Sequence, residues 1–95
     1  MKLTIVGSHL CQDTMYAIYR IKDSIRNDII KVVFNNISTN FSVLKEFLKN
    51  RENNPIYDFV KVKDKIGIPY FIFEDGTETL DLDEVLEKIS TENLR

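Results

Sequence analysis

The sequence predicts an α/β protein in which helices flank a four-stranded mixed sheet, with the element order βαβα, an irregular stretch, and then ββα. Two observations support this prediction. In the first half of the chain, short β-branched runs alternate with longer segments whose apolar residues recur at helical spacing. In the second half, a dense apolar run leads into Asp75-Gly76, a dipeptide that strongly favours a β-hairpin.

The first half of the chain predicts a strand, a crossover helix and a second strand. Residues 2–6 form an apolar run, and Gly7-Ser8 is a natural exit from a strand. Residues 12–27 are expected to be helical, with Asn27-Asp28 as the stop. The apolar stripe of this helix consists of Met15, Ile18, Tyr19, Ile21 and Ile25. Residues 29–34 predict the second strand, which the crossover makes parallel to the first.

The middle of the chain predicts a second helix that begins at residue 41 and ends near the polar cluster at residues 50–54. Its apolar positions are Phe41, Leu44, Phe47 and Leu48. Pro55 favours a short helical turn that continues through residue 60.

The last third predicts a hairpin and a final helix. Strands are expected over residues 68–73 and 77–80, and the intervening turn makes them antiparallel. Asp81 is the expected N-cap of the helix, with Glu84 three residues later as its capping-box partner. The buried stripe of this helix consists of Leu82, Val85, Leu86 and Ile89.

Length and composition restrict the functional classes. The 95 residues fit one domain over positions 1–95, and a net charge of −2 argues against a nucleic-acid partner. One cysteine cannot form an internal disulfide, and no apolar run has the length of a secretory signal or a membrane span. We therefore expect a cytoplasmic monomer or weak dimer without a membrane partner.

The one cysteine, Cys11, falls in the first turn of the first predicted helix. Unpaired N–H groups and the positive end of the helix dipole favour a thiolate there, and only the thiolate is a nucleophile. The hydroxyl of Thr14 is expected to donate a hydrogen bond to the sulfur. Protonated His9 would favour ionisation, whereas Asp13 opposes it. A lone cysteine is more often a buried small hydrophobe, but a strand-to-helix turn is not an apolar stripe.

Two motifs carry a family resemblance. Cys11-Gln12-Asp13-Thr14 follows the first strand, and Gly67-Ile68-Pro69-Tyr70-Phe71 opens a strand that runs into the Asp-Gly hairpin. In these motifs and in its element order, the chain resembles a glutaredoxin-related protein of the thioredoxin-like fold, in a monothiol form. The resemblance implies a βαβαββα thioredoxin-like (glutaredoxin-like) domain. It also implies that Cys11 attacks disulfides beside a cis Ile68-Pro69 bond.

The resemblance further implies which residues form the site. Cys11 and Thr14 would be catalytic, and the backbone of Ile68 would pair with a bound thiol substrate. The expected substrate-binding residues are Ile68, Pro69, His9, Gln12 and Lys65. The implied activity is thiol–disulfide exchange with glutathione or protein mixed disulfides, with glutathione as a co-substrate and neither a bound cofactor nor a metal.

The sequence departs from the family pattern in three places. Thr14 stands where a second cysteine is usual, so a dithiol cycle within one chain is excluded, and Gln12 replaces a proline. The start of the last helix is acidic, which disfavours the carboxylates of glutathione. The acidic residues are Asp81, Asp83 and Glu84, and the cations that could offset them are Arg20, Lys61, Lys63 and Lys65.

Two non-catalytic readings remain alternatives. In one, Cys11 helps to bind a metal or an iron–sulfur cluster shared between two chains, although Cys11-Gln12-Asp13-Thr14 differs from the Cys-Gly-Phe-Ser of cluster-binding monothiol glutaredoxins. In the other, the domain serves only protein contacts and Cys11 has no role. Colour on aerobic and anaerobic purification would distinguish the cluster-binding alternative from the other two readings. Thiol reactivity would distinguish the oxidoreductase from the domain that serves only protein contacts.

Overall fold

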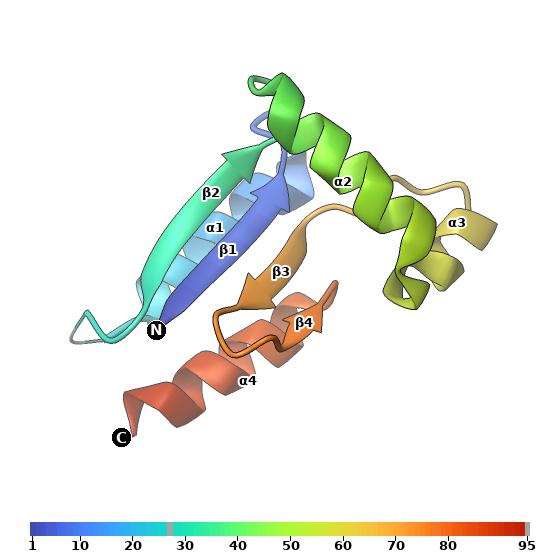
Figure 1. The fold of residues 1–95 in the computed structure, drawn as a ribbon. Coiled ribbons are helices and arrows are strands. Elements are labelled where there is room, and N and C mark those ends of the chain that lie inside the picture. The colour runs from blue at the N-terminus through green and yellow to red at the C-terminus, as the bar shows by residue number, and fades with distance from the viewer. Residues whose placement is uncertain (27, 95) are drawn as a thin grey trace.

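The structure is a computed structural model that describes residues 1–26 and 28–94. The expected order of strands and helices is confirmed, with a short helical segment in the irregular stretch (Figure 1). The elements are β1 (Lys2–Gly7), α1 (Gln12–Ser24), β2 (Lys31–Asn36), α2 (Phe41–Asn53), the 3-10 turn η1 (Pro55–Tyr57), α3 (Asp58–Val62), β3 (Tyr70–Phe73), β4 (Glu78–Thr79) and α4 (Leu82–Asn93). α1 ends three residues before Asn27, the predicted stop, which lies outside the described residues.

The four strands form one mixed sheet in the order β2-β1-β3-β4. β1 and β2 are parallel, as the crossover through α1 predicts, and β3 is antiparallel to both of its neighbours. In this register Val6 of β1 pairs with Tyr70 of β3. The loop that follows β1 therefore lies beside the segment that precedes β3.

Buried side chains form one cluster on each face of the sheet. The first core cluster lies between the sheet, α1 and α4, and consists of Leu3, Ile5, Ala17, Ile18, Ile21, Ile30, Phe71, Phe73, Val85 and Ile89. The second core cluster lies on the other face, where Phe47 of α2, Tyr57 of η1 and Tyr70 of β3 are buried. Figure 1 shows α1 and α4 behind the sheet and α2 in front, near the end of β1 and β2.

The buried face of α1 differs from the predicted stripe. Met15 and Tyr19 are 44% and 67% exposed, whereas Thr14 and Ala17 are buried. The reason is the close approach of α1 to β1: a Cβ on Gly7 would lie only 2.5 Å from the Thr14 hydroxyl oxygen. Small side chains are needed at this contact, so the larger ones face outward. In α2, Phe41 and Leu48 are likewise exposed, and Phe47 is the buried residue.

The start of α4 confirms its N-cap and corrects the capping box. The Asp81 carboxylate accepts the N–H of Asp83 at 2.9 Å. Glu84 does not close a box on Asp81, because it accepts a hydrogen bond from the Thr79 hydroxyl at 3.1 Å. The Thr79 hydroxyl oxygen in turn accepts the N–H of Asp81 at 3.0 Å.

The Ile68-Pro69 bond is cis, as the resemblance predicted. None of the helices in the described ranges combines the length and apolarity needed to cross a membrane.

Candidate functional site

Cys11 is the N-cap of α1. Its backbone is extended (φ −98°, ψ 118°), and its sulfur accepts the N–H of Thr14 at a donor–acceptor distance of 3.4 Å. Its own N–H donates to the carbonyl of Ser8, and its carbonyl accepts the N–H of Met15. The thiol is only partly exposed. The sulfur therefore lies at the helix end where backbone N–H groups are otherwise unpaired, as the sequence predicted.

Thr14 supports the sulfur with its backbone rather than with its side chain. The Thr14 side chain is fully buried against Gly7, and its hydroxyl oxygen accepts the N–H of Ser8 at 3.4 Å. The expected hydroxyl donor to the sulfur is therefore corrected to the Thr14 N–H. The cause is the close packing of α1 on β1, which turns this side chain toward the strand.

Cys11 lines an open groove of about 770 Å³, which we call the Cys11 groove. Most of its lining comes from the loop between β1 and α1, the loop after β2, and the segment between α3 and β3; the rest comes from α1, α3 and the residue after β4. Its lining residues are Ser8, Leu10, Cys11, Asp13, Ile37, Ser38, Val60, Asp64, Lys65, Ile66, Gly67, Ile68, Pro69 and Leu80. Four of the predicted site residues, Cys11, Lys65, Ile68 and Pro69, are thus brought together.

The segment before β3 is held by Arg51 from the last turn of α2. The Arg51 guanidinium donates to the carbonyls of Ile66 at 2.8 Å and Lys65 at 2.7 Å. Two residues later, the Ile68 N–H and C=O make no hydrogen bond within the described part of the chain. These groups are therefore available to a bound extended segment. No local sequence signal points to Arg51, because its partners lie 14 and 15 residues away.

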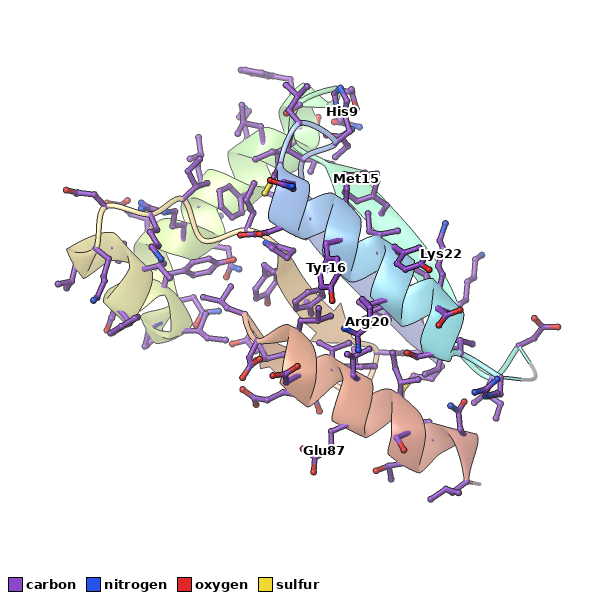
Figure 2. The ribbon with its side chains drawn as sticks, turned by 180° about the vertical axis from the view of Figure 1, so that it is seen from behind. His9, Met15, Tyr16, Arg20, Lys22 and Glu87 are labelled. Atoms are coloured by element: carbon purple, nitrogen blue, oxygen red, sulfur yellow. The ribbon has the colours of Figure 1, made fainter. Side chains whose placement is uncertain are left out.

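Two predicted site residues lie outside this groove. Figure 2 shows His9 at the loop that precedes α1, directed away from that helix. The His9 Nδ1 lies 2.9 Å from the side-chain amide nitrogen of Asn36; this nitrogen can only donate, so Nδ1 is the acceptor. Gln12 is exposed, and neither His9 nor Gln12 is among the groove-lining residues.

Of the predicted cations, only Lys65 lines the groove. Lys61 pairs with Asp58 at 3.9 Å, and the Lys63 ammonium lies 5.2 Å from the centroid of the Phe59 ring. Arg20 donates to the Tyr16 hydroxyl at 2.7 Å, on the exposed side of α1 (Figure 2). The other three cations that could offset the acidic start of the last helix therefore do not line the groove.

A metal centre finds no support in the arrangement of ligand side chains. Across residues 1–26 and 28–94, no three His, Cys, Asp or Glu residues are grouped in a way that could hold an ion.

Comparison with protein-family models, with curated proteins and with solved structures gives no match to this chain.

Proposed function

We propose that the chain is a thioredoxin-like thiol–disulfide oxidoreductase of the monothiol glutaredoxin type, in which Cys11 exchanges with mixed disulfides. One observation carries the proposal: a partly exposed thiol at the N-cap of α1 lines the same groove as Ile68 and Pro69. The strand order β2-β1-β3-β4, with α1 and α4 on one face and α2 on the other, is compatible with a thioredoxin-like arrangement.

The proposed reaction consists of two exchange steps. In the first, the Cys11 thiolate attacks one sulfur of a disulfide RS–SR′, forms Cys11–S–SR, and releases R′S⁻. In the second, an external thiolate R″S⁻ attacks the mixed disulfide at the substrate sulfur, forms RS–SR″, and releases the Cys11 thiolate. Disulfide bonds and electrons balance in both steps. An external thiol is required because Thr14 occupies the position where a second cysteine could act.

Three residues, Thr14, Ile68 and Arg51, have a role in the first step. The Thr14 N–H donates a hydrogen bond to the sulfur, which orients it at the start of the helix. The free backbone groups of Ile68 pair with an extended substrate segment. Arg51 fixes the segment that carries Ile68, which limits the loss of conformational entropy on docking.

The test measures exchange by following release of 2-thiopyridone from a neutral peptide activated as its 2-thiopyridyl disulfide. A matched control moves the thiol to another helix N-cap, in the double variant Cys11→Ser/Asn40→Cys. Asn40 caps α2, which like α1 has 13 residues, and its side chain accepts the N–H of Val43 at 3.1 Å. The control therefore keeps the thiol at a helix N-terminus but places it at a residue that does not line the groove.

Cys11 should react about tenfold faster than the relocated thiol, because only Cys11 lies beside a docking segment. The mixed disulfide on Cys11 should then be released by added thiol, which mass spectrometry detects. Equal rates for the two proteins would mean that the groove contributes nothing, and the proposal would fail.

A further inference from the structure

The walls of the Cys11 groove are largely apolar and reach the surface. Leu10, next to the thiol in sequence, is 78% exposed, and Ile66, on the segment before β3, is 60% exposed. Deeper in the groove, Val60, Ile68 and Leu80 pack on the second core cluster. Apolar side chains are thus offered on two separate loops beside the sulfur, which suits a ligand with apolar groups on both sides of its reactive atom.

The apolar surface continues beyond the groove. Val60 and Leu80 also line an adjoining hollow, together with Phe59, which is 69% exposed. This hollow reaches the N-terminus of α4, where Asp81 and Glu84 are part of the lining. A ligand bound to Cys11 can therefore extend over a surface that combines apolar side chains with carboxylates.

The charges on this surface are mainly negative. The described residues that line the groove and the hollow include four carboxylates and one ammonium. The carboxylates are those of Asp13, Asp64, Asp81 and Glu84, and the ammonium is that of Lys65. The N-terminus of α4 does not offset this, because the Asp81 carboxylate already accepts the N–H of Asp83. An anionic ligand would thus meet a surface with a formal excess of negative charge, and a cationic ligand would be attracted.

On the basis of the proposed function, we infer that the disulfide partner of Cys11 is a cysteine within an extended polypeptide segment that carries apolar side chains and positive charge. Glutathione, which has two carboxylates and one ammonium, is disfavoured at the same surface. Leu10 and Ile66 contact the side chains that flank the substrate cysteine, and the acidic residues attract basic side chains further along. The free backbone groups of Ile68 pair with the segment itself.

The test compares three substrates that share one leaving group. Each is a 2-thiopyridyl disulfide: a Lys-Leu-Cys-Leu-Lys peptide, the same peptide with Glu in place of Lys, and glutathione. The Cys11 thiolate attacks the substrate sulfur, the bond to the pyridyl sulfur breaks, and the leaving group takes up a proton to become 2-thiopyridone. Dividing each rate by the rate with 2-mercaptoethanol removes intrinsic differences between the disulfides.

The lysine peptide should react about tenfold faster than the glutamate peptide and glutathione at low ionic strength, and the ratio should shrink in 1 M salt. The variant Asp64→Asn/Asp81→Asn should lower the low-salt ratio severalfold. Asparagine suits both positions, because Asp64 has a φ of +56° and Asp81 is an N-cap. Its charge-matched control is Asp23→Asn/Glu87→Gln, at residues that do not line the groove or the hollow.

A second pair of variants tests the apolar contacts. Leu10→Ser/Ile66→Ser should slow the leucine-flanked peptide severalfold and leave a serine-flanked peptide unchanged. Both side chains are well exposed, so neither substitution removes core packing. Val62→Ser is the control, because Val62 is 84% exposed and lies outside the groove lining.

The outcomes distinguish a failure of the substrate inference from a failure of the proposed exchange function. If Cys11 outpaces the relocated thiol but reacts equally with all three substrates, or fastest with glutathione, the substrate inference is wrong and the exchange function stands. A charge preference that is unaffected by Asp64→Asn/Asp81→Asn also overturns the inference. If Cys11 reacts no faster than the relocated thiol with any substrate, the exchange function fails, and the inference fails with it.

Discussion

Replacing Gly67 with alanine tests whether the segment before β3 is fixed by close packing against Tyr57. Gly67 has a φ of +92°, and a Cβ built on it would lie 2.8 Å from Cδ1 and 2.9 Å from Cε1 of Tyr57. The Tyr57 ring cannot swing aside easily, because it is fully buried between Phe47 and Tyr70, at centroid distances of 5.9 and 5.6 Å. Alanine at this position must therefore shift either the ring or the loop.

Gly76 provides a matched control for the backbone contribution. It has the same φ of +92°, but a Cβ built on it meets nothing within 4 Å. The strained backbone should cost roughly 1–3 kcal/mol in either alanine variant. Overpacking against Tyr57 should add about 1–3 kcal/mol in Gly67→Ala alone.

Urea unfolding followed by circular dichroism measures both variants. We expect Gly67→Ala to lower the free energy of unfolding by roughly 2–6 kcal/mol, the sum of strain and overpacking, and Gly76→Ala by the strain alone. If the losses of unfolding free energy in the two variants agree within about 0.5 kcal/mol, the usual scatter among surface substitutions, close packing of Gly67 against Tyr57 does not fix this segment.

Two further predictions concern the clamp on this segment and the hairpin. Arg51→Met should slow exchange with peptide disulfides severalfold and lower stability by only about 1 kcal/mol, since the two freed carbonyls can bind water; alkylation of Cys11 by iodoacetamide, which needs no docking, should be unchanged, and an equal loss in both reactions would contradict the positioning role. In the hairpin, the hydrogen bond from the Thr77 N–H and the contact with Lys88 lower the pKa of Asp75 from 3.8 to about 2. The ionised Asp75 carboxylate therefore stabilises the folded state fully above about pH 4, and this stabilisation is lost as the pH falls toward about 2. Asp75→Asn should accordingly make the thermal midpoint less dependent on pH between these values. An unaltered pH dependence in the variant would rule this out.

Local sequence signals predicted the elements because each signal acts within a few residues. The turn at Asp75-Gly76 and the N-cap Asp81 are both found, whereas the cis bond before Pro69 was expected from the family resemblance and not from a local signal. The buried face of α1 was not predictable in the same way. Ile18 and Ile21 fit both the predicted and the observed stripe, and only the contact between Gly7 and α1 decides which neighbours are buried.

The grouping of Cys11 with Ile68 and Pro69 was expected from the family resemblance, and sheet pairing explains it physically. The pairing of Val6 with Tyr70 places the loop after β1 beside Pro69, so Cys11 and Ile68-Pro69 line one groove. The positions of the lysine ammonium groups were not predictable in this way, because a long flexible side chain can reach several partners. Lys61, for example, pairs with Asp58. Arg51 was missed for the same reason, since its partners are backbone carbonyls on a distant loop.

The two core clusters have a consequence for how the Cys11 groove can move. The helix that carries Cys11 packs on the first core cluster, whereas Val60, Ile68 and Leu80 pack on the second. The opposing walls of the groove are therefore supported by separate sets of buried side chains on opposite faces of the sheet. A local opening confined to the layer of α2, η1 and α3 would widen the groove while the amides of α1 stay protected from solvent exchange. We therefore expect that local opening of this layer does not require unfolding of the helix that carries the thiol.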